Sequence, residues 1–141
     1  MNFSKYINLP YRLKGRDFKG VDCFGIIWLI YKEELGITLP DFLNVDYDDT
    51  WYKNGKNHIL NEMGTFNDKL WSRAEKPYQL FDGLIFYLSS KKIANHCGMY
   101  IGDNKVIHVF EDSTSQVDRV DSGFMRLYGV IRYINLKEER Q

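Results

Sequence analysis

The chain has 141 residues, of which 44% are hydrophobic and 16% aromatic, and this length and composition predict a single folded domain over residues 1–141. Its 19 basic and 19 acidic side chains cancel, so it lacks the excess positive charge that nucleic-acid-binding proteins and proteins of anionic membrane surfaces carry. No apolar run approaches the roughly 18 residues that span a bilayer, and the first ten residues lack the charged and apolar regions of a signal peptide, so we expect neither membrane binding nor a signal peptide.

The first regular element that the sequence predicts is a helix over residues 22–35, after an irregular stretch over residues 1–20. Asp22 is a suitable N-cap, because its carboxylate can accept hydrogen bonds from the free amides of the first turn. Gly36 is a typical C-terminal stop. The helix has an apolar stripe at the spacing i, i+3, i+4 and i+7, formed by Cys23, Ile26, Ile27 and Ile30.

The rest of the chain is predicted to be mostly strands. Residues 41–79 are polar and aromatic without clear periodicity, and we expect one or two short helices there. The strands are predicted over Leu84–Leu88, His96–Ile101, Lys105–Phe110 and Tyr128–Ile134. A helix followed by antiparallel strands indicates an α+β fold.

Cys23 and Cys97 are the only cysteines, and we expect both to be free thiols, because a chain of this size needs no disulfide. We do not expect a zinc site of two cysteines and two histidines, since the cysteines lack the close spacing of zinc ligands. Asp103 and Asp112 are isolated carboxylates typical of solvated turns. We therefore assign no metal and no cofactor.

A cysteine at the start of a helix is either a small core residue or a nucleophile. Cys23 falls in the predicted first turn, where free amides and the helix dipole favour a thiolate. A nearby imidazole can take the proton of the thiol. Cys97 is expected to point away from His96, because neighbouring residues of a strand face opposite ways.

The two histidines of the predicted hairpin share a face only in one register. A three-residue loop, Gly102 to Asn104, pairs Ile101 with Lys105 and Tyr100 with Val106, and makes His96 and His108 diagonal neighbours. A two-residue loop would place them on opposite faces. Each histidine taken alone is more often an ordinary strand residue.

The sequence resembles the NlpC-type cell-wall cysteine peptidases in two blocks. The first comprises Tyr11–Gly15, Gly20–Gly25 and Gly36–Pro40; the second comprises His96–Gly102 and Val106–His108. The match runs in order from about Tyr11 to Phe110. The resemblance implies a compact papain-like domain, in which a helix carrying the nucleophile packs on an antiparallel sheet.

The resemblance also implies roles for site residues. Cys23 matches the nucleophile, His96 the general base and His108 the polar residue that orients the base. Tyr11 matches a tyrosine that shapes the site. We expect Asp22, the helix cap, to help bind the substrate or shape the site as well. The substrates implied are the peptide stems of peptidoglycan, which these enzymes cut as endopeptidases.

Two departures from the family pattern bear on function. Phe24 stands where cell-wall members commonly have Ser, and is expected to alter the pocket for the stem peptide; Asp82-Gly83 stands where Gly-Asp is common. The Phe24 form resembles single-domain members of bacteriophage tails, which implies a virion tail location and tail-tip partner proteins. Two alternatives remain: a structural tail component without turnover, and an amidase or acyltransferase that uses the same thiol.

Overall fold

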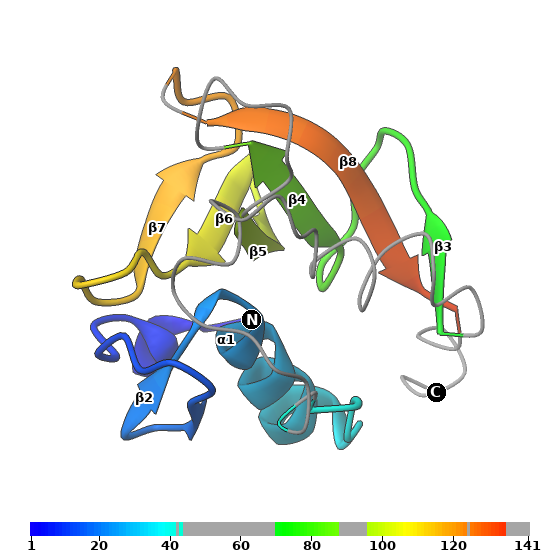
Figure 1. Cartoon of the computed structure of the whole chain (residues 1–141). Helices are drawn as coiled ribbons and strands as arrows, with labels where there is room; N and C mark the ends of the chain where they lie inside the picture. Colours follow the sequence, from blue (N-terminus) through cyan, green and yellow to red (C-terminus); the bar gives the residue numbers. More distant parts are fainter. Residues whose placement is uncertain (42, 44–69, 88–95, 124, 135–141) are drawn as a thin grey trace.

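The computed structural model describes residues 1–41, 43, 70–87, 96–123 and 125–134. A six-stranded antiparallel sheet arches over the helix α1 (Figure 1), which confirms the predicted α+β class. The strands lie in the order β3-β8-β4-β5-β6-β7. Their bounds are Trp71–Arg73 (β3), Gly83–Tyr87 (β4), His96–Gly102 (β5), Lys105–His108 (β6), Gln116–Arg119 (β7) and Arg126–Tyr133 (β8).

The helix α1, Cys23–Ile30, is buried along most of its length, and only its residues Cys23 and Trp28 are partly exposed. The chain continues as a π-helical turn, Tyr31–Leu35, and ends at Gly36, which has φ 67°. The predicted cap and stop are therefore confirmed, and the predicted helix is present with a π-helical last turn. Among the described residues, no helix is long and apolar enough to cross a bilayer.

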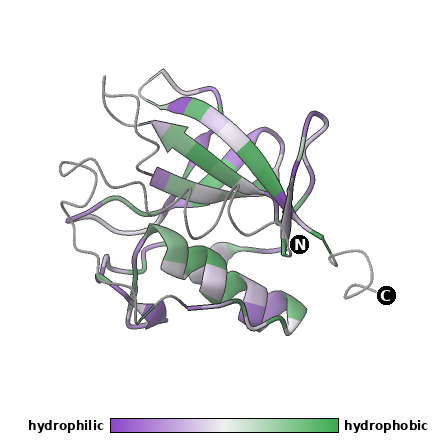
Figure 2. Ribbon diagram, turned by 45° about the vertical axis from the view of Figure 1, so that its right-hand side comes forward, coloured by the Kyte–Doolittle hydropathy of each residue, from purple (hydrophilic) through white to green (hydrophobic). Residues whose placement is uncertain are grey.

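The two faces of the sheet bury different apolar side chains. The face toward α1 carries alternate residues of the central strands, namely Ile85, Cys97, Met99 and Ile107, packed with the helix. The opposite face carries the intervening residues Leu84, Phe86 and Val106, and is covered by Val120 and Met125. Figure 2 shows the apolar ribbon of α1 below apolar stretches of the sheet. The period of two along each strand thus decides which side chains meet the helix.

The β5–β6 hairpin has the predicted register, but it reaches that register by a different turn. Tyr100 pairs with Val106 as predicted, whereas Lys105 pairs with Gly102 and the predicted Ile101–Lys105 pair is wrong. The turn consists of two residues, Asp103 and Asn104, both with positive φ, and the register shifts between Tyr100 and Gly102. This β-bulge adds the extra residue that a three-residue loop would have supplied. The side chains before the bulge therefore lie on the faces that the three-residue loop predicts.

Several elements were not predicted from the sequence. These are β3, β7, a two-stranded hairpin of β1 (Arg16–Asp17) and β2 (Gly20–Val21), and a 3₁₀ turn over Ser4–Tyr6. Within residues 41–79, residues 42 and 44–69 lie outside the described part, and residues 71–73 form β3 rather than a helix. Leu88, at the end of a predicted strand, also lies outside the described residues. The last strand begins at Arg126, two residues before its predicted start.

Candidate active site

Cys23 is the first residue of α1, and the carboxylate of Asp22 holds that first turn in place. Oδ1 of Asp22 accepts hydrogen bonds from the Gly25 amide at 2.7 Å and from the Arg16 guanidinium at 2.8 Å. Oδ2 accepts from the amide of Lys14 at 2.9 Å. Asp22 is only 3% exposed, which favours a supporting role over direct contact with a substrate. The free amides of the turn favour negative charge on a sulfur at this position.

Tyr11 and Phe24 both lie close to the start of α1. Tyr11 forms a backbone bridge with Val21, two residues before Cys23, and its side chain is partly buried against the helix-facing core. Phe24 is buried, and the guanidinium of Arg16 lies 5.4 Å from the centre of its ring. Both residues therefore help to form the layer around Cys23, and their action on a substrate stays a prediction.

His96, the first residue of β5, and His108, the last residue of β6, lie side by side on one face of the hairpin. Nε2 of His96 lies 2.8 Å from Nδ1 of His108, a hydrogen-bond distance, and the ring centres are 5.0 Å apart. His96 stands directly opposite Phe86 of β4. A Cβ atom added at Gly98 would lie 2.9 Å from the Cβ of His108, so only glycine leaves room for this histidine. The predicted pairing of the two histidines is confirmed.

The second nitrogen of His108 contacts Asp118, a residue that the sequence analysis missed. Nε2 of His108 lies 2.7 Å from Oδ2 of Asp118, and Nε2 of Gln116 donates to the same oxygen at 2.6 Å. Both side chains come from β7, where the alternation of Gln116, Val117 and Asp118 is the one local signal of a strand and is too short to predict one. The imidazole pair is therefore connected to a carboxylate at one end.

Aromatic rings surround the histidine pair and keep water away from it. The ring of Phe110 stacks on His96, with centres 4.8 Å apart and planes at 15°, and meets His108 edge-on. His96 is 3% exposed and His108 is fully buried. Burial lowers the pKa of His96 well below its usual value of 6.5, and His108 lowers it further. Burial also lowers the pKa of His108, although Asp118 opposes this shift. Both rings are thus neutral near pH 7.

The Cys23 thiol is placed beside Cys97 rather than in a hydrogen bond with His96. Cys97 belongs to the helix-facing core against which Cys23 packs, so the predicted orientation of Cys97, away from His96, is confirmed. Burial raises the pKa of the Cys97 thiol, and a hydrogen bond with Cys23 raises it further. Among the described side chains, no hydrogen bond joins Cys23 to His96. Both cysteines are free thiols.

The described residues contain no group of three or more His, Cys, Asp or Glu side chains arranged to hold a metal ion. The described side chains of this site offer a thiol, two neutral imidazoles and a carboxylate. Such a set is suited to nucleophilic attack on a carbonyl carbon with proton transfer through an imidazole.

The NlpC/P60 family model matches residues 8–132, which include the start of α1, the histidine pair and Asp118. This chain belongs to the NlpC/P60 family. The predicted resemblance is confirmed, and so is the papain-like α+β fold. The crystal structure of the NlpC/p60 domain of peptidoglycan hydrolase SagA superposes with a TM-score of 0.58 at 18% identity, over 92% of this chain and 91% of that one.

Three further comparisons, two with curated proteins and one with a solved structure, show what the chain is similar to. It is 22% identical to the murein DD-endopeptidase MepS/murein LD-carboxypeptidase of Escherichia coli (strain K12) over 111 residues, 79% of this chain and 47% of that protein. It is 29% identical to the tail tip assembly protein K of Escherichia phage lambda over 116 residues, 81% of this chain and 55% of that protein. The chain thus spans about half the length of these curated relatives. NlpC2 from Trichomonas vaginalis superposes with a TM-score of 0.64 at 17% identity, over 92% of this chain and 44% of that one.

Proposed function

We propose that this chain is a cysteine hydrolase that cleaves peptide stems of peptidoglycan as an endopeptidase. Cys23 is the nucleophile, His96 the general base and His108 the residue that orients the base. The observation that carries this proposal is the His96–His108 hydrogen bond, which uses Nε2 of His96 and leaves its Nδ1 without that partner. Family membership supports the substrate class.

The first chemical step transfers the proton of the Cys23 thiol to Nδ1 of His96. The thiolate then attacks the carbonyl carbon of a stem amide, and the new C–S bond forms as the carbonyl becomes an oxyanion. The C–N bond breaks when the protonated His96 gives its proton to the leaving amine. This sequence needs His96 neutral at the start, which agrees with the lowered pKa of its buried ring.

The second half of the reaction releases the acyl group from Cys23. Neutral His96 takes a proton from water as the oxygen attacks the thioester carbon. The C–S bond then breaks, and protonated His96 returns its proton to the sulfur of Cys23, which restores the thiol and the neutral imidazole. Catalytic hydrogen bonds are often long or unmade before substrate binds and tighten in the complex. We propose that the contact between Cys23 and Cys97 belongs to the free enzyme. When the substrate binds, Cys23 leaves Cys97 and contacts His96 instead.

The similarity to a tail tip assembly protein supports a bacteriophage tail as the place of action. There the hydrolase would open the host wall locally or act during tail assembly, with other tail-tip proteins as partners. Phe24, buried against Arg16, is proposed to narrow the pocket for the amino end of the stem.

A second candidate function is a structural tail component that retains the fold without turnover. Two observations favour it: the Cys23 thiol contacts Cys97 instead of His96, and His96 is buried. An amidase or acyltransferase is the third candidate, in which an amine other than water accepts the acyl group.

Incubation of the purified protein with isolated peptidoglycan, followed by mass analysis of the released fragments, separates these candidates. Cleavage within the peptide stems, lost in Cys23→Ala and His96→Ala, supports the endopeptidase. Release of the stem from its sugar, or transfer to an added amine, identifies the third candidate. Unchanged peptidoglycan with folded wild-type protein contradicts the hydrolase and supports the structural component.

A further inference from the structure

Asp118 lies at the end of a chain of hydrogen bonds that runs through both buried histidines. We infer that Asp118 is a positioning residue, which fixes the nitrogens of His108 and His96 that carry protons and so keeps Nδ1 of His96 available as a base. The part of the inference that concerns His96 as a base rests on the proposed function. The part that concerns the proton positions on the two histidine rings does not depend on any substrate.

The proton positions follow from the contacts one step at a time. A carboxylate only accepts hydrogen bonds, so at 2.7 Å from Asp118 the Nε2 of His108 carries the proton and donates it. Nδ1 of the neutral His108 ring is then a lone pair. That lone pair accepts from Nε2–H of His96 at 2.8 Å. The neutral His96 ring therefore has its own lone pair at Nδ1, the nitrogen that the proposed mechanism needs.

The carboxylate is held where this arrangement requires it. Asp118 pairs with Val106, and Gln116 pairs with His108, so Asp118 is the diagonal neighbour of His108 on the same face. The amide of Gln116 donates to Oδ2 at 2.6 Å, the oxygen that also receives His108. The pKa of Asp118 is raised by burial but lowered more by its bonds to Gln116 and His108, with a net shift downward. Asp118 is thus charged at neutral pH.

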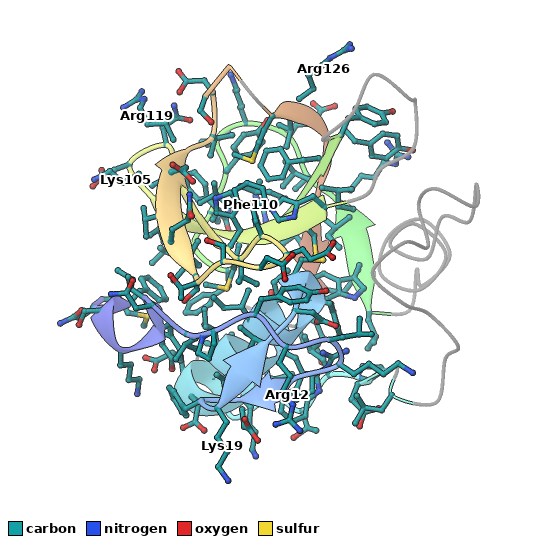
Figure 3. The ribbon with its side chains drawn as sticks, turned by 60° about the vertical axis from the view of Figure 1, so that its left-hand side comes forward. Arg12, Lys19, Lys105, Phe110, Arg119 and Arg126 are labelled. Carbon is teal, nitrogen blue, oxygen red and sulfur yellow. The ribbon has the colours of Figure 1, made fainter. Side chains whose placement is uncertain are left out.

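Without Asp118, the histidine pair has two arrangements instead of one. A His108 ring that carries its proton at Nδ1 donates to Nε2 of His96, and the His96 proton then occupies Nδ1. In that arrangement His96 cannot accept the thiol proton of Cys23. Among the described residues, Asp118 acts on the charge of His108, and His108 acts on that of His96. In the view of Figure 3, Phe110 lies in the central part of the picture, whereas Lys19, Lys105, Arg119 and Arg126 lie toward its outline.

The test compares Asp118→Ala and Asp118→Asn with the matched control Asp121→Ala. Asp121 is an exposed carboxylate three residues further on, paired with Arg119. ¹⁵N NMR shifts of the imidazole nitrogens, recorded without substrate, report the proton positions directly. In the wild type we expect protons on Nε2 of both rings. Asp118→Ala should give averaged shifts, and Asp118→Asn should retain the wild-type pattern, because its amide oxygen can still accept from His108 and Gln116.

The second readout is the rate at which iodoacetamide alkylates Cys23 between pH 5 and pH 9. Asp118→Ala should slow it near pH 7 by about twofold, since two comparably populated arrangements leave His96 able to accept the proton about half of the time. Asp118→Asn should slow it less, and Asp121→Ala should not change it. Wild-type shifts and alkylation rates in Asp118→Ala would overturn the inference, as would averaged shifts in the wild type. If Asp118→Ala does not fold, Asp118→Asn alone tests the inference. Averaged imidazole shifts in Asp118→Asn would overturn the inference, and so would a loss of Cys23 alkylation as large as that in His96→Ala. A wild-type protein with the expected shifts but no action on peptidoglycan would instead contradict the proposed function alone.

Discussion

The buried histidine pair should make the stability of this protein depend on pH in the mildly acidic range. As the pH falls, the imidazoles of the unfolded chain take up protons near pH 6.5. In the folded protein the pKa of His96 is well below 6.5, because the ring is buried beside His108. The unfolded state therefore binds more protons than the folded state, and the free energy of unfolding decreases as the pH is lowered.

The size of the effect follows from the difference in protonation. One proton bound only by the unfolded chain changes the free energy of unfolding by about 1.4 kcal/mol per pH unit. His96 alone should thus remove about 2 kcal/mol between pH 7 and pH 5 if its folded ring stays neutral over that range. His108 adds a smaller loss, because Asp118 opposes the downward shift of its pKa. A loss of about 2 kcal/mol is large beside the 5–15 kcal/mol typical of a folded domain.

The assay is urea unfolding at pH 7, 6 and 5, followed by tryptophan fluorescence, for the wild type and His96→Asn. The variant removes the titrating ring, so its stability should fall less steeply with pH even if its stability at pH 7 is lower. The slope with pH, rather than the absolute stability, is the quantity compared, provided that the urea m-value is unchanged. Equal slopes in the two proteins would refute the argument that His96 is a neutral, buried base.

Three further predictions concern the start of α1 and the hairpin. Iodoacetamide should label Cys23, which is partly exposed, well before the buried Cys97, and Cys23→Ala should fold normally; peptide mapping that finds equal labelling rates would contradict this. Gly98→Ala should lower the free energy of unfolding by about 1–3 kcal/mol, because the new Cβ meets a side-chain carbon of β6 at 2.6 Å; an unchanged urea midpoint would count against the close packing. Asp22→Ala should cost about 3 kcal/mol or more, since it removes the carboxylate that pairs with the buried Arg16 guanidinium and uncaps α1, whereas the exposed control Asp17→Ala should cost little. A similar shift of the urea midpoint in both variants would contradict the supporting role of Asp22.

Local chemistry explains why the helix was predictable from the sequence. Asp22 can cap a helix and Gly36 can end one whatever the rest of the chain does, because both effects depend on hydrogen bonds and dihedral angles within a few residues. The strands β4, β5 and β8 were predictable for a similar reason, since each is a run of apolar and aromatic residues. The family blocks around Cys23 and His96 made the site residues candidates before any coordinates.

Short elements without a strong local pattern were not predictable. The strands β3 and β7 have three and four residues, and their propensity is weak until a neighbouring strand supplies hydrogen bonds. Asp118 was missed for this reason: nothing in its local sequence indicates that His108 lies beside it.

The sequence by itself determined the helix with Cys23 at its start, the antiparallel strands around the two histidines, and the family. The tertiary structure alone decided which side chains meet. A β-bulge in place of a longer loop brought His96 and His108 to one face, strand alternation placed Cys97 rather than His96 against Cys23, and β7 delivered Asp118 to the histidine pair. The physical reason is that turn length and bulges together set the pairing register of neighbouring strands. A shift of one residue in that register turns every following side chain of the strand to the other face of the sheet.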